Sequence, residues 1–202
     1  IGQPSLDINT DYDGTTISAF GGAVVYSGYA AGALGHPTAV LPKANLKQTD
    51  VGAIFATAKN VTVFPVDSTA GTSISNVYHT ADRERRTCKA ISRIDPYRVS
   101  EIPDVDANIY HLAGLVHGDI GEEIIAFAAQ KAKVAVDVQC LLRWVEDGNM
   151  VFHDWAHKKE YLPMIDYLKT DAAEAEILTG LTDRPTAARQ LFDWGAKEVM
   201  IT

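Results

Sequence analysis

The chain has 202 residues, of which 47% are apolar and 22% charged, values that are ordinary for one globular domain with a proper core. Its formal net charge of −8 argues against a protein that binds nucleic acid or an anionic membrane. It does not argue against binding of a nucleotide, because Mg²⁺ and backbone N–H groups can neutralise the charge of a nucleotide. No apolar run reaches the roughly 18 residues of a membrane span, and no signal peptide is visible.

The two cysteines, Cys88 and Cys140, lack the spacing of a metal or redox motif. We therefore expect both to be reduced, structural residues of a cytoplasmic protein. The chain starts without Met at what reads as the end of a strand and stops at residues 199–202, inside or just after another. We accordingly expect residues to be missing on both sides.

A run of small and apolar residues, 23–34, follows the pair Gly21-Gly22 and is closed by Gly35. The run carries no charge, so it predicts a helix that is buried on nearly every face. Gly35 suits the left-handed position beyond the last turn. The glycine pair has two interpretations. It is either a tight turn before a core helix, or a place where the backbone approaches a ligand with the positive end of the helix.

The rest of the chain alternates between short apolar runs and stretches with helical spacing, such as the one that contains Val51 and Phe55. At least five such alternations predict a parallel α/β sheet with helices on both faces. We expect a minor hairpin that turns at Asp147-Gly148, and a loop or short strand at residues 6–9. The predicted strands are residues 38–41, 61–66, 108–112, 134–138, 165–168 and 198–201, and the further helices are residues 46–59, 119–131, 171–179 and 185–194.

Two of these helices carry N-terminal capping signals. Asp119 is the expected N-cap of the helix at 119–131, with Glu122 at the capping-box position, and Asp171 and Glu174 have the same spacing.

Residues 68–93 break the alternation. They are polar, rich in Thr and Ser, and form two extended runs around Ala81-Asp82, which predicts a β-hairpin that leaves the main body. A solvated surface hairpin accounts for its basic residues when these are considered alone. They are Arg83, Arg85, Arg86, Lys89 and Arg93.

Ligands of parallel α/β sheets bind beyond the carboxyl ends of the strands. The candidate residues at these ends are Asp7, Gly21, Gly22, Gly114, Asp137, Gln139 and Asp171.

Three stretches are matched in order and spacing by one family. The first is Gly2-x4-Asp7 with Gly21-Gly22 and the small-residue helix; the second is the polar hairpin that starts at Asp67; the third runs from Lys169 to Gly180. Together they resemble the ribokinase-like, or PfkB, carbohydrate kinase family. Supporting similarity lies in Val136-Asp137-Val138-Gln139-x3-Arg143.

The resemblance implies a three-layer α/β/α sandwich with a mainly parallel sheet. It implies a C-terminally incomplete core of residues 1–66 and 94–202, and a small β-hairpin lid of residues 67–93. It further implies a cytoplasmic kinase that phosphorylates a sugar or sugar-like hydroxyl with ATP and Mg²⁺. The lid would exclude water from the site, and in many relatives it pairs with a second subunit, which implies a homodimer.

The resemblance also implies the roles of individual residues. Asp7 would accept charge-assisted hydrogen bonds from acceptor hydroxyls, although a turn-stabilising Asx residue is the alternative. Glu174 would orient Mg²⁺ and its waters near the donor phosphates without a direct metal ligand, although a capping box is the alternative. The substrate-binding set is Asp7, Gly21, Gly22, Asn76, Asp137 and Gln139, and the nucleotide and metal shell is Asp171 and Glu174.

Four departures from the family pattern stand out. Tyr26 occupies a position that is often Asn, Asp171 replaces the usual Asn, and residues 43–51 lack the usual glycine-and-acid pattern. The Gly-Ala-Gly-Asp motif, whose Asp is the catalytic base, is absent. We expect that Asp beyond residue 202, so no catalytic residue is named and residues 1–202 alone are expected to be inactive.

Three alternatives remain: a nucleoside kinase, a non-catalytic sugar-binding or regulatory module on the same fold, and an unrelated flavodoxin-like protein. The hairpin inserted after Val66 argues against the last of these. The sequence does not identify the acceptor.

Overall fold

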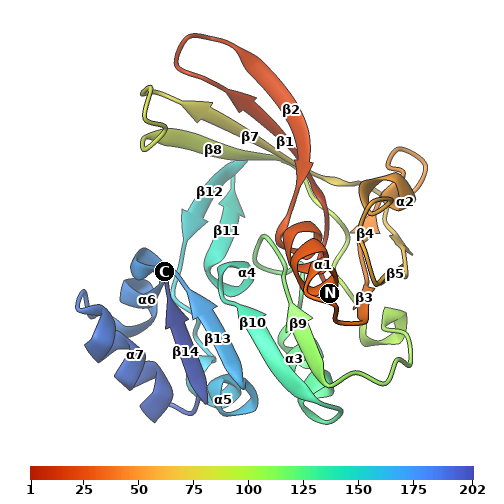
Figure 1. Ribbon diagram of the computed structural model, residues 1–202. Helices are drawn as coiled ribbons and strands as arrows, with labels where there is room; N and C mark the ends of the chain where they lie inside the picture. Colours follow the sequence, from red (N-terminus) through yellow and green to blue (C-terminus); the bar gives the residue numbers. More distant parts are fainter. The chain divides into compact units, whose positions relative to one another are not determined.

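A computed structural model describes residues 1–202 and divides them into two compact units, each of which is α/β (Figure 1). Unit 1 consists of Ile1, Pro96–Trp144 and Phe152–Thr202, and unit 2 of Gly2–Asp95 and Val145–Val151. No helix has the length and apolar character needed to cross a membrane.

Unit 1 is built on a four-stranded sheet whose pairings are all parallel, in the order β14-β13-β10-β9. Alternate side chains of these strands form its core, since Leu112, Val134 and Leu168 are at most 1% exposed. Helix α3 packs on β10 and α7 on β14. The strands are β9 (Ile109–Leu112), β10 (Lys133–Asp137), β13 (Tyr167–Thr170) and β14 (Glu198–Ile201); the helices are η1 (Val99–Glu101), α3 (Glu122–Ala129), α4 (Gln139–Leu142), α5 (Lys158–Tyr161), η2 (Leu162–Met164), α6 (Ala172–Thr179) and α7 (Arg184–Asp193).

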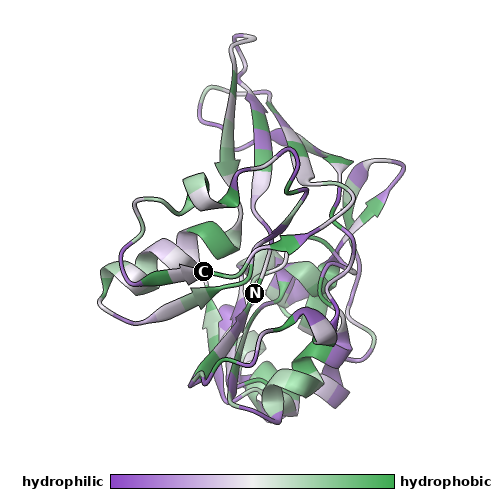
Figure 2. Cartoon of the chain, turned by 90° about the vertical axis from the view of Figure 1, so that its right-hand side faces the viewer, coloured by the Kyte–Doolittle hydropathy of each residue, from purple (hydrophilic) through white to green (hydrophobic).

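Unit 2 contains most of a six-stranded mixed sheet in the order β11-β12-β8-β7-β1-β2. Strand β1 runs antiparallel to β2 and parallel to β7, which in turn runs antiparallel to β8. Hydrophobic and hydrophilic residues follow one another along these strands (Figure 2). The strands are β1 (Ser5–Thr10), β2 (Thr16–Gly21), β7 (Thr72–Tyr78), β8 (Arg86–Ser92), β11 (Arg143–Glu146) and β12 (Asn149–Phe152).

A second part of unit 2 has its own core, in which Val24, Val40 and Phe55 are each at most 4% exposed. Helix α1 packs there on β3 and β5, which pair in parallel. The elements are α1 (Ala23–Ala33), β3 (Thr38–Val40), β4 (Lys43–Ala44), α2 (Val51–Ile54), β5 (Val61–Val63) and β6 (Val66–Asp67).

Helix α1 corrects one prediction and confirms another. The prediction that this helix is buried on nearly every face was wrong, because Tyr26 is 66% and Leu34 is 78% exposed. Only one face of the helix packs on the small sheet. The small residues serve that face: a Cβ at Gly32 would fall 1.9 Å from the Lys59 carbonyl oxygen. Gly35 is left-handed as predicted, with φ of 89°.

The predicted helix at 46–59 is wrong, because only α2 forms there. Asp50 accepts a hydrogen bond from the Ala53 N–H at 2.9 Å and caps this short helix. The preceding residues form a turn in which the Asn45 carbonyl accepts from Gln48 and Thr49. The apolar residues with helical spacing anchor a loop in the core of unit 2 rather than a long helix.

The predicted cap at Asp119 is also wrong, because α3 begins at Glu122 with Gly121 as its N-cap. Asp119 is 1% exposed, and its carboxylate accepts from the Val116 N–H at 2.8 Å, so it closes the preceding turn. Glu122 accepts from the Trp155 indole N–H at 2.6 Å instead of closing a cap.

The predicted hairpins are confirmed. Asp147 and Gly148 have φ of 48° and 79° between β11 and β12. Residues 68–93 contain the antiparallel pair β7 and β8, but this pair is part of a larger sheet with β1 and β2, of which only a short strand at 6–9 was anticipated. The division into a core and a lid of residues 67–93 stays a prediction.

Candidate functional site

The candidate residues of unit 2 lie on one face of the six-stranded sheet. Parallel pairing puts alternate residues of β1 beside alternate residues of β7, and such residues share a face. Five of these six side chains are polar, so the face offers a row of hydrogen-bonding groups. The three pairs are Ser5 with Thr72, Asp7 with Ile74, and Asn9 with Asn76.

Asp7 lies at the centre of this row. Its Oδ1 accepts a hydrogen bond from the Ser5 hydroxyl at 2.8 Å. Partial burial raises the pKa of Asp7, while the Ser5 hydroxyl and the charge of Arg86 act in the opposite direction. The residue lies inside a strand and its carboxylate bonds to no backbone N–H, so the alternative of a turn-stabilising Asx residue is wrong.

The glycine pair brings the backbone close to β1. A Cβ at Gly21 would lie 2.6 Å from Asp7 Oδ2, and a Cβ at Gly22 would lie 2.5 Å from the Gln3 carbonyl oxygen. Gly22 also has φ of 104° as the N-cap of α1, a conformation that favours glycine. Gly22 is therefore required by its close approach to backbone and by its φ, whereas a Cβ at Gly21 would meet only side-chain atoms. The contact of either glycine with a ligand stays a prediction.

Asn76 is 7% exposed, and its Nδ2 donates to Asn9 Oδ1 at 3.1 Å. Sequence reasoning missed Ser5 and Asn9. The signal that reveals them is the period-two alternation of polar residues along Ser5–Thr10, which places them on the face of Asp7.

Among the basic residues of the hairpin, Arg86 belongs to this face. It pairs with Tyr78 across β7 and β8, and its Nη1 donates to the Tyr78 hydroxyl at 3.4 Å. Arg83 instead forms a 2.6 Å ion pair with Asp11 that joins the tips of two hairpins.

The candidate residues of unit 1 follow the carboxyl ends of adjacent parallel strands, where ligands of such sheets bind. Asp137 ends β10, and its Oδ2 lies 3.5 Å from Lys169 Nζ on β13. Gln139 receives a 2.6 Å hydrogen bond from Arg143 Nη2 at its Oε1 and donates to the Leu115 carbonyl at 3.4 Å. The side chains of Asp137 and Gln139 thus already have partners within unit 1. Two of these partners, Lys169 and Arg143, are candidate residues that the predicted site did not include.

Asp171 and Glu174 form the capping box that the sequence predicts. The Glu174 N–H donates to Asp171 Oδ1 at 2.7 Å, and the Asp171 N–H donates to Glu174 Oε2 at 2.8 Å. Glu174 is 2% exposed, and this burial raises its pKa, while the Asp171 N–H opposes the shift. No three ligating side chains gather into a metal cage. That these two carboxylates orient Mg²⁺ through its waters stays a prediction.

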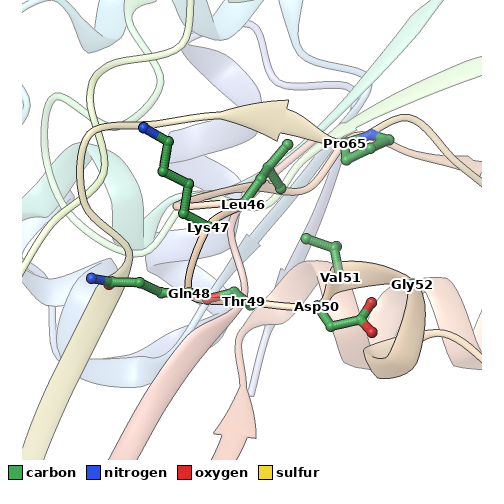
Figure 3. A pocket seen from close by; sticks show the side chains of 8 residues that line it. All are labelled: Leu46, Lys47, Gln48, Thr49, Asp50, Val51, Gly52 and Pro65. Atoms are coloured by element: carbon green, nitrogen blue, oxygen red, sulfur yellow. The ribbon is translucent and has the colours of Figure 1, made fainter.

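An open pocket of about 540 Å³ lies elsewhere in unit 2 (Figure 3). The side chains of Lys47 and Asp50 extend in different directions there, so no convergent polar set lines it. None of the candidate residues belongs to this pocket, whose lining is Leu46, Lys47, Gln48, Thr49, Asp50, Val51, Gly52 and Pro65. The chemistry favours the face of β1 and β7.

No family model and no curated protein sequence matches the chain. Among solved structures, it is similar to a sulfate complex of a pyrophosphate-dependent kinase in the ribokinase family, with 32% identity and a TM-score of 0.90 over 100% of this chain and 71% of that one. It is similar to such a kinase complexed with a pyrophosphate analogue and myo-inositol, with 32% identity and a TM-score of 0.89 over 100% and 70%. The ribokinase of Arabidopsis thaliana with ribose and ATP shares the fold, at 16% identity and a TM-score of 0.66 over 99% and 69%.

The chain belongs to the ribokinase family. The family resemblance and the ribokinase-like α/β fold inferred from the sequence are confirmed, and the flavodoxin-like alternative is wrong. Membership supports kinase activity in general terms, on a small sugar or polyol.

Proposed function

We propose that the protein transfers a phosphoryl group from pyrophosphate to a hydroxyl of a cyclic polyol of the inositol class, releasing orthophosphate. The observation that supports this most is the 32% identity, over the whole chain, with a pyrophosphate-dependent kinase complexed with myo-inositol. ATP, the donor that the sequence resemblance implies, is the alternative. Its support comes from structures at 16% identity, which share only the fold.

The polar face of β1 and β7 is the proposed acceptor site. Phosphoryl transfer depends mainly on positioning and charge stabilisation, and a row of alternating polar side chains is what a ring of hydroxyls needs for orientation. Asp7 would accept charge-assisted hydrogen bonds from neighbouring hydroxyls. Asn76, held by Asn9, would offer a fixed amide. Gly21 would keep space open beside Asp7, and Gly22 would let the backbone approach the acceptor at the start of α1. In unit 1, Asp137 and Gln139 are proposed as further substrate-binding residues.

The donor side is proposed to lie at Asp171 and Glu174, beside Lys169. Their carboxylates would hold Mg²⁺ through water, and the ion would neutralise charge on the donor phosphates. The Gly-Ala-Gly-Asp motif does not occur in residues 1–202. We place the catalytic base outside these residues and expect them to be inactive alone. The chain spans 71% of the similar pyrophosphate-dependent kinase.

A homodimer through the six-stranded sheet of unit 2, which contains the lid strands β7 and β8, is part of the proposal. Closure of the lid over the acceptor and a cytoplasmic location are also part of it. The dimer is supported by apolar side chains on the sheet face opposite Asp7, where Phe20 pairs with Leu6 and is 47% exposed. The location is supported by Cys88 and Cys140, neither of which forms a disulfide.

Phosphorus NMR on the complete protein tests the function. Pyrophosphate or ATP would be supplied with Mg²⁺ and one acceptor at a time: myo-inositol, ribose, fructose or a nucleoside. We expect a phosphate monoester and orthophosphate from pyrophosphate and myo-inositol, at a rate at least about 10-fold above that with ATP, a difference of about 1.4 kcal/mol in the barrier. Preference for ATP with ribose, fructose or a nucleoside would contradict the proposal, and binding without transfer would indicate a non-catalytic module.

A further inference from the structure

Tyr26 presents an unusual hydroxyl at the edge of the acceptor face. It lies in the first turn of α1, where its N–H donates to the Gly22 carbonyl at 3.4 Å. The side chain is 66% exposed, although it is large and aromatic. Its phenolic oxygen has no hydrogen-bond partner within the chain.

The phenolic oxygen and the Asp7 carboxylate converge over Gly21. A Cβ at Gly21 would lie 2.6 Å from Asp7 Oδ2 and 3.1 Å from Tyr26 Oη. Because both oxygens lie so close to one point, they are separated by at most about two O–H···O hydrogen-bond lengths. They form no hydrogen bond with each other. Glycine at position 21 keeps this space free of side-chain atoms.

The gap between the two oxygens suits one hydroxyl group. An alcohol oxygen donates one hydrogen bond and accepts up to two, whereas an ionised carboxylate only accepts and a phenol can donate. A hydroxyl in this space can therefore donate to Asp7 and accept from Tyr26 at the same time. A hydrogen at that position of the ring can neither donate to Asp7 nor accept the phenolic hydrogen.

We propose that Tyr26 is a specificity-determining residue, which donates its phenolic hydrogen to the same acceptor hydroxyl that donates to Asp7. The pair selects a hydroxyl against a hydrogen at that position of the ring. This inference rests on the proposed function, in which the acceptor is a polyol, and it adds a residue and a selection rule to that function.

The test is Tyr26→Phe in the complete protein, which removes one oxygen and keeps the ring. The loss of one hydrogen bond should raise the KM for myo-inositol by about 3- to 10-fold. The kcat should stay within about 2-fold and the KM for the phosphate donor should not change, since the lost bond is to the acceptor. The preference for myo-inositol over a deoxy analogue that lacks this hydroxyl should fall, a change that a merely structural residue would not cause.

Tyr12→Phe is the matched control. Tyr12 is 62% exposed in the turn between β1 and β2 and also lacks a hydrogen-bond partner within the chain, so its loss should change none of these values. Unchanged KM and selectivity in Tyr26→Phe, or equal changes in both variants, would overturn the inference. A wild-type protein that neither binds nor phosphorylates any tested polyol overturns the proposed function as well, whereas an active wild type with an unaltered variant overturns this inference alone.

Discussion

Asp7 is a carboxylate that gives up part of its hydration when the chain folds. Its partners within unit 2 are the hydroxyl of Ser5 and the charge of Arg86, and burial outweighs both in raising its pKa. Hydroxyls of a bound polyol would replace the water that the carboxylate loses. Asp7 thus lowers the stability of the free protein, and in the proposed site it would recover hydrogen bonds when the acceptor binds.

We expect Asp7→Asn to raise the KM for the acceptor at least about 10-fold while the protein stays folded, because removing a charge from a buried hydrogen bond costs about 2–5 kcal/mol of binding. Steady-state kinetics measures the effect. Asp13→Asn, at an exposed aspartate of the turn between β1 and β2, is the control and should have no effect. A KM that does not change in Asp7→Asn would remove Asp7 from the site.

The pH dependence follows from the direction of the shift. Because the pKa of Asp7 is raised, acceptor binding in the wild type should weaken as pH falls through a value above the usual range of an aspartate. The ionised form also costs stability, and this cost appears as pH rises through the same range. The thermal midpoint of Asp7→Asn at neutral pH should thus equal or exceed that of the wild type, and the difference should vanish in acid.

At the scale of elements, the start of α6 has an observed role and a proposed one, which use the same side chains. The reciprocal bonds of Asp171 and Glu174 satisfy two backbone N–H groups that a helix leaves unpaired. A capping box does not require burial, yet Glu174 is 2% exposed and the pKa of its carboxyl is raised by that burial. A carboxylate kept in such surroundings fits a role beyond the cap.

Glu174→Gln separates the two roles, because Gln also closes a capping box but carries no charge. We expect the variant to fold with equal or slightly higher stability at neutral pH, since a buried charge is removed, and to match the wild type in acid, where Glu174 is neutral. It should turn over at least about 10-fold more slowly and need more Mg²⁺ for half its maximal rate.

Kinetics at graded Mg²⁺ and thermal unfolding measure these quantities. Glu176→Gln, two residues along the same helix and exposed, is the control and should leave both unchanged. Wild-type turnover and Mg²⁺ dependence in Glu174→Gln would leave Glu174 as a cap only.

At the scale of the whole molecule, the six-stranded sheet of unit 2 has two faces of different character. One carries the polar row around Asp7, and the other carries Leu6, Ile8 and Phe20, which alternate with that row. Strand β2 also lies at the edge of the sheet, and nearly all of its residues are exposed. An exposed apolar face beside an open strand edge is a surface that proteins usually cover.

We expect a homodimer that buries this face. Light scattering coupled to gel filtration should give twice the subunit mass for the wild type and one subunit mass for Phe20→Lys, because a lysine there would put a charge into an apolar contact. Phe192→Lys, at a phenylalanine of unit 1 that is 49% exposed, should remain dimeric. A monomeric wild type, or a dimer that survives Phe20→Lys, would contradict the lid interface.

The features that depend on local physics could be predicted from the amino-acid sequence. The capping box at Asp171 follows from the spacing of two side chains, the left-handed Gly35 from the absence of a Cβ, and the turn at Asp147-Gly148 from the positive φ that such a hairpin requires. The order and spacing of motifs along the chain also indicated the ribokinase family, which the comparisons show. Through that resemblance they pointed to Asp7 and the glycine pair, whose contact with a ligand stays a prediction.

Features that depend on contacts between residues distant in the sequence could not be predicted and follow from the fold. Residues 46–59 have a helical pattern, yet burial of Val51 and Phe55 in the small core fixes them as a loop with one short helix. The polar row arises because β1 pairs with β7. Tyr26 lies beside this row because the first turn of α1 lies close to β1. Spacing along a chain sets local hydrogen bonds, but the approach of Asp7, Gly21 and Tyr26 to one point is set by how strands and helix pack.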